Sequence, residues 1–291
     1  MGYKIDNAVI MAAGMSSRFA PISFEKPKAL INIRGEILIE RQIRQLREKG
    51  IHDIIIVTGY KKEQFEYLKE RYGVRLIENE DYHIRNNHSS IYAARAYLKN
   101  SYVCSADNYF TVNPFESEVD GSYYAALFSP GKTNEWCLQT DHNDRITGVQ
   151  IGGKGTWYMM GHTFWDREFS NKFVHILETV YQKEDTKAKL WEDIYRENLD
   201  TLHMKIRRYQ PGQIYEFDSL DELRIFDSKY LEDSGSQIMR NLAERLNCRE
   251  SEMSHLEPVK TENGDVTGVR FLCRKKVYEF DYKNEMLSNG V

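Results

Sequence analysis

The residues best suited to chemistry lie in one loop near the N-terminus. An apolar run at residues 8–13 ends at Gly14, which allows the backbone to approach a ligand closely. Two serines and Arg18 follow, and Lys28 comes ten residues later. Backbone amides and hydroxyls can bind phosphate oxygens, while the two cations balance their charge. The loop therefore suits a triphosphate; the alternative is an ordinary surface loop with an exposed arginine and lysine.

Strand and helix patterns alternate along about the first hundred residues. Short apolar runs predict buried parallel strands, and amphipathic segments between them predict helices. The expected strands are residues 8–13, 53–58, 74–77 and 101–105, and the expected helices are 37–49, 61–72 and 89–98. This order predicts an α/β fold with a doubly wound, mixed but mostly parallel, Rossmann-like sheet. Ligands of such sheets bind at the carboxyl ends of the strands, so the loops after Ala13 and Ser105 are the expected site.

The pattern changes in the second half of the chain. Residues 121–165 alternate in short steps, which predicts several short strands in a mixed or antiparallel insertion. Within them, residues 148–155 approach a phosphate-loop pattern, but Gly155 stands where serine or threonine should be, so we expect a hairpin turn. The other expected elements are helices at 167–183, 187–198 and after Asp218, and a strand at 202–209.

A short tail follows a linker at residues 233–236. Residues 237–246 predict a helix, and two short strands are expected after a tight turn at Asn263-Gly264. We therefore expect a main domain over residues 1–232 and a small α+β extension over residues 237–291.

Composition narrows the class of protein. The 291 residues include 40 Lys and Arg against 44 Asp and Glu, so the net charge of −4 offers no basic surplus for nucleic acid. No apolar run approaches the length of a membrane span and no signal-peptide pattern is present, which favours a cytoplasmic protein. Four widely spaced cysteines predict reduced thiols. Aromatic residues make up 12% of the chain, and a ligand can use some of them.

The loop carries a longer signature than its glycine. Residues 12–18 are Ala-Ala-Gly-Met-Ser-Ser-Arg, and residues 27–30 are Pro-Lys-Ala-Leu. This string resembles the A-A-G-x-x-S-R…P-K-A-L signature of the nucleotidyltransferases that include sugar-nucleotide pyrophosphorylases and cytidylyltransferases. The G-x-G-x-x-G pattern of dinucleotide-binding enzymes is absent, which disfavours an oxidoreductase.

Further segments narrow the resemblance. In order along the chain they are Asn86-Asn87, residues 105–109, Asn134-Glu135-Trp136, residues 161–166, Leu190-Trp191-Glu192 and residues 214–219. Together they resemble the bacterial CTP:phosphocholine cytidylyltransferases over about residues 5–230.

The resemblance implies roles for four charged residues. Arg18 and Lys28 would be catalytic, with Lys28 at the α-phosphate and Arg18 at the β- and γ-phosphates. Asp107 and Asp218 match the family's metal-binding aspartates, and Mg²⁺ prefers carboxylate and phosphate oxygens. Without the resemblance, Asp107 could form an Asx turn and Asp218 could cap the following helix.

The resemblance also implies a nucleotide-binding set. It comprises Ala12, Ala13, Gly14, Met15, Ser16, Ser17, Asn87 and Ser90. The base would lie against the backbone of residues 12–14, with the amide of Asn87 and the hydroxyl of Ser90 as contacts. Asn87 fits a turn equally well, and Ser90 fits the start of a helix.

The implied acceptor pocket uses aromatic and acidic side chains. A trimethylammonium group has no N–H to donate, so proteins bind it with aromatic faces and nearby negative charge. Trp136 and Trp191 match the family's choline-binding tryptophans, while Tyr215 fits either the pocket or the core. Glu192 stands where the family usually has aspartate, and it and Glu216 would supply the charge. Without the resemblance, both tryptophans fit the core.

The resemblance implies an Mg²⁺-dependent enzyme that transfers CMP from CTP to phosphocholine, releasing CDP-choline and pyrophosphate. The alternatives are 2-aminoethylphosphonate or a sugar 1-phosphate as acceptor, or a nucleotide sensor without catalysis. The tail faintly resembles the first strands of bacterial choline-kinase-like proteins; an unrelated dimerisation element is the alternative. The sequence leaves a homo-oligomer open.

Overall fold

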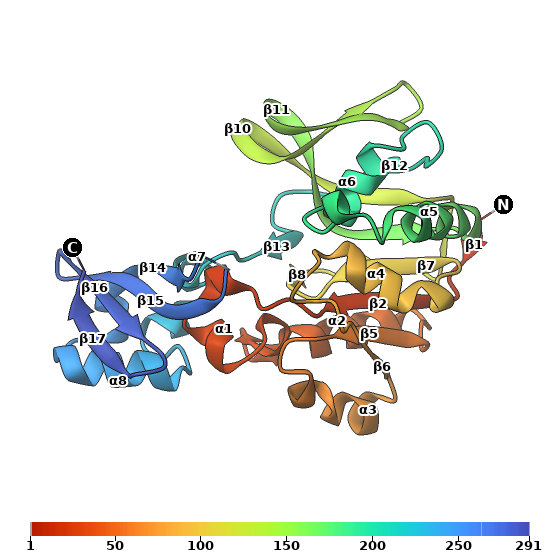
Figure 1. Cartoon of the computed structure of the whole chain (residues 1–291). Coiled ribbons are helices and arrows are strands. Elements are labelled where there is room, and N and C mark those ends of the chain that lie inside the picture. The colour runs from red at the N-terminus through yellow and green to blue at the C-terminus, as the bar shows by residue number, and fades with distance from the viewer. Residues whose placement is uncertain (1, 263, 291) are drawn as a thin grey trace. The chain divides into compact units, whose positions relative to one another are not determined.

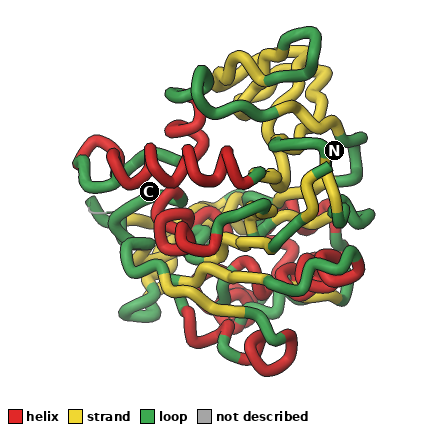
Figure 2. Tube along the Cα trace, turned by 90° about the vertical axis from the view of Figure 1, so that its right-hand side faces the viewer, coloured by secondary structure: helices red, strands yellow, loops and turns green. Residues whose placement is uncertain are grey.

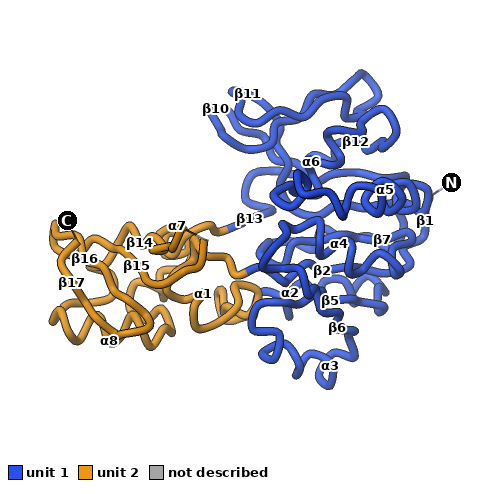
Figure 3. The backbone as a smooth tube through the Cα atoms, in the orientation of Figure 1, with its two compact units in different colours: residues 1–14, 38–216 blue, residues 15–37, 217–291 orange. Residues whose placement is uncertain are grey.

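The computed structural model describes residues 2–262 and 264–290. The chain divides into two compact units (Figure 3). The first comprises residues 1–14 and 38–216, and the second comprises residues 15–37 and 217–291. The division therefore differs from the boundary expected near residues 232–237, because residues 15–37 and 217–232 group with the C-terminal segment.

Seven strands form the main sheet of the first unit, in the order β12-β10-β11-β7-β2-β5-β6 (Figure 1). They are β2 (Asn7–Ala12), β5 (Ile54–Thr58), β6 (Arg75–Glu78), β7 (Ser101–Ser105), β10 (Tyr123–Thr140), β11 (Ile146–Trp165) and β12 (Lys205–Arg208). Neighbours from β7 to β6 are parallel, as are β10 and β12, whereas β11 is antiparallel to both of its neighbours. The expected mixed, mostly parallel α/β sheet is confirmed.

The central strands are buried on both faces, which explains why their sequences are continuous apolar runs. Val9 and Ile10 point to opposite faces of β2, and both are fully buried. The α-helices of this unit are α2 (Leu38–Glu48), α3 (Tyr67–Tyr72), α4 (His88–Ala94), α5 (Arg167–Val180) and α6 (Trp191–Arg196). One core cluster joins α4, α5 and α6 to the sheet face that carries Val9.

The strand register brings the two expected site loops together. Met11 of β2 pairs with Ser105 of β7, so both strands end at the same edge. Beyond the pairing, the amide of Ala106 donates to the carbonyl of Met11 at 3.1 Å. The loops after β2 and β7 therefore begin side by side at the carboxyl edge of the sheet, as expected.

Residues 121–165 form two long strands, and the several short strands that we expected there are wrong. β10 has 18 residues and β11 has 20, and bulges interrupt their antiparallel pairing. Their distal parts project as a two-stranded ribbon (Figure 2). The hairpin turn expected at residues 148–155 is also wrong, because these residues lie within β11. Glycines in a bulged strand have the same sequence pattern as a turn, which misled the prediction.

Short elements complete the first unit. They are β1 (Tyr3–Lys4), β8 (Asn108–Phe110), β9 (Glu118–Val119) and β13 (Ile214–Glu216). β1 pairs with β9, and β8 pairs with β13, each pair antiparallel. The second pair matters for function because β8 directly follows the turn that carries Asp107.

The second unit combines the loop after β2 with the C-terminal part of the chain. Its elements include α1 (Ile22–Glu25), β3 (Asn32–Ile33), β4 (Glu36–Ile37), α7 (Leu220–Phe226), α8 (Gln237–Leu246), β14 (Met253–Lys260), β15 (Val266–Cys273), β16 (Lys276–Asp281) and β17 (Met286–Asn289). The last four strands form an antiparallel sheet in chain order, where the sequence predicted two strands. β14 lacked a strand signal because Pro258 and the positive φ of His255 interrupt its alternation.

The other tail predictions have different outcomes. The helix expected at residues 237–246 is confirmed as α8, and the hydroxyl of Ser236 caps it by accepting the amide of Met239. In the expected turn, Asn263 lies outside the described residues, while Gly264 has a φ of +89°.

All four cysteines are free thiols. Across residues 2–262 and 264–290, no helix is both long and apolar enough to cross a membrane.

Candidate active site

The carboxyl end of β2 leaves open space for a ligand. Ala12 and Ala13 are buried at the strand end, and the amide of Tyr60 donates to the carbonyl of Ala13 at 3.0 Å. Gly14 is exposed, and a Cβ placed there would meet no described atom within 4 Å. Packing therefore does not require this glycine, whereas close approach of a ligand to the backbone would.

Asp107 lies in the turn between β7 and β8, next to two other predicted site residues. β13 pairs with β8 so that Glu216 is opposite Asn108 and Tyr215 is opposite Tyr109. The Nδ2 of Asn108 donates to Oε2 of Glu216 at 3.3 Å. The pairing of β8 with β13 thus brings Asp107, Tyr215 and Glu216 together, although more than a hundred residues separate them in the sequence.

A second group of predicted residues meets where α4 and α6 begin. The Oδ1 of Asn87 accepts the amide of Trp191 at 2.7 Å, and its Nδ2 donates to Oε2 of Glu192 at 3.1 Å. The hydroxyl of Tyr124, on β10, donates to the other carboxylate oxygen of Glu192 at 3.1 Å. The ring of Tyr124 stacks on Trp191 with centroids 5.6 Å apart. Glu192 is therefore held in a defined position by two side chains from separate elements.

The electrostatics show that the two groups share one acidic region. Burial raises the pKa of Glu192 to about 7, although hydrogen bonds from Asn87 and Tyr124 oppose this rise. Burial also raises the pKa of Tyr124 well above its ordinary value, and the negative charge of Glu192 raises it further. Glu216 and Asp107 act in the same direction on that pKa. Glu192 is hydrogen-bonded to Tyr124, and the negative charges of Glu216 and Asp107 also act on it, so this region has an electrostatic character suited to a cation.

The two predicted tryptophans differ in accessibility. Trp136, on β10, is half-buried, and the guanidinium of Arg196 lies 5.2 Å from its ring centroid. Its ring therefore already contacts a cation. Trp191 is only 2% exposed and packs against Trp165 and Phe173 as well as Tyr124. Trp191 therefore packs in the core beside Tyr124, and its role in acceptor binding stays a prediction.

The predicted base contacts already have protein partners. Both polar groups of the Asn87 side chain bind the start of α6, as described above. The hydroxyl of Ser90 is 4% exposed and accepts a hydrogen bond from Nδ2 of Asn79 at 3.2 Å. In this structure both side chains therefore also bind other parts of the protein.

The second unit holds the remaining predicted residues. Arg18 donates to the carboxylate of Asp218 at 2.6 Å, and the Arg18 side chain is 72% exposed. Ser16 has a φ of 53°, and residues 17–19 form one short 3₁₀ turn directly after it. Asp218 does not cap the next helix, because Ser219 accepts the amide of Glu222 as the N-cap of α7. The carboxylate of Asp218 is thus directed to a cation rather than to a helix end.

Lys28 is a buried cation of the same unit. Its side chain is 6% exposed, and its ammonium lies 5.9 Å from the ring centroid of Phe19. Burying an ammonium is costly unless anions compensate it.

The donors fit Mg²⁺ delivered together with a nucleotide. Among the described residues, no three His, Cys, Asp or Glu side chains are arranged to hold a metal ion. Mg²⁺ is typically held by one or two carboxylates and substrate phosphates, so a full protein cage is not required. Asp107 and Asp218 have the appropriate chemistry, because both are partly accessible carboxylates.

Sequence reasoning missed Tyr124, and it missed a buried amide on α2, Gln42, that is described below. Tyr124 has the ordinary strand pattern of an inward-facing residue, so nothing in the sequence marked it.

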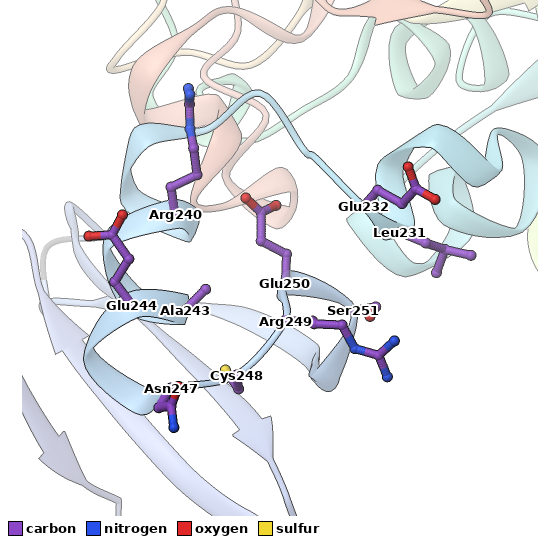
Figure 4. Close-up of a pocket in the computed structure, with 10 residues that line it drawn as sticks. All are labelled: Leu231, Glu232, Arg240, Ala243, Glu244, Asn247, Cys248, Arg249, Glu250 and Ser251. Carbon is purple, nitrogen blue, oxygen red and sulfur yellow. The ribbon is translucent and has the colours of Figure 1, made fainter.

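A further cavity of about 750 Å³ lies beside α8 in the second unit, lined by Arg240, Glu244, Cys248 and Arg249 among others (Figure 4). No predicted site residue lines this cavity.

Comparisons with known proteins identify the chain's relatives. The MobA-like NTP transferase domain family matches residues 8–114. The choline-phosphate cytidylyltransferase of Streptococcus pneumoniae is 37% identical over 217 residues, which cover 75% of this chain and 95% of that protein. The 2-aminoethylphosphonate cytidylyltransferase of Lancefieldella rimae is 35% identical over 234 residues, covering 77% of this chain and 93% of that protein.

A solved structure agrees with the sequence relatives. The CTP:phosphocholine cytidylyltransferase LicC from Streptococcus pneumoniae superposes with a TM-score of 0.74 at 36% identity. The superposition covers 78% of this chain and 99% of that chain. Both the fold and the sequence therefore point to one group of nucleotidyltransferases.

Proposed function

Because the chain belongs to the bacterial choline-phosphate cytidylyltransferase family of nucleotidyltransferases, we propose that it transfers CMP from CTP to phosphocholine. The products would be CDP-choline and pyrophosphate. The observation that supports this choice of acceptor is the buried carboxyl group of Glu192, which is hydrogen-bonded to Tyr124, with the negative charges of Glu216 and Asp107 also acting on that tyrosine. Half-buried Trp136 adds an aromatic ring, which in this structure contacts the guanidinium of Arg196.

The proposed reaction is an in-line displacement. A phosphate oxygen of the acceptor attacks the α-phosphorus of CTP, the new P–O bond forms, and the bond to the β-phosphate oxygen breaks with its electrons on pyrophosphate. Lys28 neutralises charge on the α-phosphate, and Arg18 neutralises charge on the leaving group. Asp107 and Asp218 are each candidate ligands of Mg²⁺, which would supply Lewis-acid stabilisation of the phosphate oxygens. The backbone of residues 12–17 would hold the nucleotide, with Asn87 and Ser90 supporting this site.

The acceptor's cationic end would be recognised by charge and by aromatic contact. A quaternary ammonium cannot donate an N–H hydrogen bond, so a carboxylate can attract it even when the carboxylate oxygens already accept hydrogen bonds from the protein. Glu192 suits this requirement because three donors already bind its carboxylate: Asn87, Tyr124 and its own backbone amide. Glu216 and Tyr215 would complete the acceptor pocket beside Asp107.

The second candidate acceptor is 2-aminoethylphosphonate. It is favoured by the Lancefieldella rimae relative, whose identity to this chain is nearly equal to that of the choline-phosphate enzyme.

Pyrophosphate release should be measured with four nucleoside triphosphates, Mg²⁺, and a panel containing phosphocholine, 2-aminoethylphosphonate and sugar 1-phosphates. We expect the highest kcat/KM with CTP and phosphocholine. Turnover confined to a sugar phosphate would refute the choline proposal. If no pair of substrates reacts, the enzyme proposal is refuted and a nucleotide sensor without catalysis remains as the alternative.

Replacing Trp136 with alanine is expected to raise the KM for phosphocholine about tenfold, because one cation–π contact is lost. The KM for CTP should stay within about twofold of wild type. Steady-state kinetics with each substrate varied in turn would measure both constants. Trp157 is a matched control, since it is also half-buried and lies on the partner strand β11. Equal changes in both KM values would make Trp136 a structural residue.

Acceptor use is expected to depend on pH through Glu192. With a pKa of about 7, its carboxyl group is mostly neutral at pH 6 and mostly ionised at pH 8. The kcat/KM for phosphocholine should therefore rise about tenfold across this range, beyond the change caused by the substrate's own phosphate. Glu192→Gln should abolish this additional rise while leaving the substrate's contribution. An unchanged pH profile in the variant would contradict the assignment.

The same group also predicts a stability effect of known sign. Because folding raises the pKa of Glu192, the folded state retains its proton at pH values where the unfolded chain has lost it. The free energy of unfolding should therefore fall as the pH rises from the ordinary carboxyl range to about 7. Thermal unfolding of wild type and Glu192→Gln across this range would show the difference.

A further inference from the structure

Helix α2 directs three polar side chains at the segment that follows β7. Arg41 donates through Nε and Nη2 to the carbonyl of Phe110 at 2.9 and 2.8 Å. Gln45 donates to the same carbonyl at 3.2 Å. Gln42 is different, because it binds on both sides of Asp107.

The side-chain amide of Gln42 brackets the turn that carries Asp107. Its Nε2 donates to the carbonyl of Ser105 at 2.9 Å and to the carbonyl of Asn108 at 2.9 Å. These carbonyls belong to the last residue of β7 and the first residue of β8. Both amide hydrogens of Gln42 are therefore used to fix the two ends of a turn only two residues long.

The orientation of Gln42 is strongly determined. The side chain is 1% exposed, and its Oε1 has no hydrogen-bond partner among the described residues. A buried acceptor without a partner is costly, so an apolar residue would be preferred here if only packing mattered. Rotating the amide by 180° would place its oxygen against two carbonyl oxygens. The two bonds to the turn are thus the interaction that keeps this amide in the core.

The turn held by Gln42 is also connected to the predicted acceptor pocket. Asn108, whose carbonyl Gln42 holds, donates from its own side chain to Glu216. The turn also starts beside the end of β2, through the bond from the amide of Ala106 to Met11. A shift of the turn would therefore move Asp107 relative to both substrate regions of this unit.

We propose that Gln42 is a positioning residue that fixes Asp107 for metal binding by holding the two ends of its turn. This inference rests on the proposed function for the identity of the metal-bearing residue. Gln42 itself contacts neither metal nor substrate. Residues that orient metal ligands typically contribute about 10- to 100-fold to metal affinity or activity.

The test compares Gln42→Met with Gln45→Met. Methionine keeps the approximate length of the side chain but donates no hydrogen bond. Gln45 is a matched control because it is also buried on α2, and Arg41 still binds the carbonyl of Phe110 when Gln45 is replaced. Mn²⁺ binding in the presence of CTP, followed by electron paramagnetic resonance of the free ion, is the first readout. The Mg²⁺ concentration for half-maximal turnover and the KM for phosphocholine are the second.

We expect Gln42→Met to raise the Kd for Mn²⁺ and the Mg²⁺ requirement about tenfold or more. The KM for phosphocholine should change less than the Mg²⁺ requirement, and Gln45→Met should stay within about twofold of wild type in both metal readouts. Equal metal affinities in the two variants would overturn the inference, as would a wild-type protein that binds no Mn²⁺ with CTP.

The outcome is separable from that of the proposed function. A wild-type protein without turnover would refute the proposed function, while Mn²⁺ binding would still decide the role of Gln42. Thermal unfolding shows whether Gln42→Met is folded, and Gln42→Glu, which is nearly isosteric, is the second variant. If neither variant folds while Gln45→Met does, the bonds serve stability alone and the inference is refuted.

Discussion

Replacing Asp107 with asparagine is expected to lower kcat by at least about a thousandfold. Asparagine preserves the size of the side chain but removes the negative charge that would bind Mg²⁺. Loss of metal-ion stabilisation of the α-phosphate removes several kcal/mol from the transition state, and about 4 kcal/mol corresponds to a thousandfold. Pyrophosphate release at saturating CTP and phosphocholine would measure the effect.

The structure provides a matched control for this aspartate. Asp53 precedes β5 at the opposite end of the sheet and forms a largely exposed ion pair with Arg75 at 2.6 Å. Asp53→Asn should leave kcat within about twofold, because exposed ion pairs contribute little. Unfolding midpoints of the two variants should be similar. If Asp107→Asn retains activity, Asp107 is not a metal ligand.

Replacing Lys28 with methionine should lower kcat by about 100- to 1000-fold, the range for removal of one pre-organised donor to a transition-state oxyanion. Burial makes the charge effective, because little water screens it. The KM for CTP should rise much less than kcat falls, since the α-phosphate gains charge only as the reaction proceeds. Single-turnover kinetics with CTP in excess would separate the two effects.

Lys26 is the control for Lys28. It lies two residues earlier in the same segment and is exposed. Lys26→Met should retain near wild-type kcat. Similar losses in both variants would indicate a general effect of charge on nucleotide binding, and a loss of CTP affinity without a change in kcat would place Lys28 away from the α-phosphate.

The sequence predicted the central sheet well because its signals are local. Buried parallel strands are continuous apolar runs, and the alternation with amphipathic helices restricts their connections. The prediction failed for residues 121–165, where glycines and bulges interrupt strands of 18 and 20 residues. Strand length there depends on pairing with a partner strand, which local sequence does not encode.

Side-chain environments were harder to predict than elements. Asn87 and Ser90 fitted either ligand contacts or local structural roles, and in the structure Asn87 binds the start of a distant helix and Ser90 binds another side chain. Trp191 fitted either the acceptor pocket or the core, and four rings pack around it. Amides, hydroxyls and tryptophans serve the core and binding sites equally well, so only their neighbours distinguish the roles.

By itself, the sequence determined the class of fold and the group of enzymes, because these depend on short motifs and on periodicity. Only the tertiary structure decided which charges act together. Glu192 is hydrogen-bonded to Tyr124, Glu216 lies opposite Asn108 beside Asp107, and Gln42 reaches the Asp107 turn from α2. The pKa of Glu192 and the position of Asp107 depend on burial and on distances between atoms far apart in the chain. Such quantities exist only once the strands have paired.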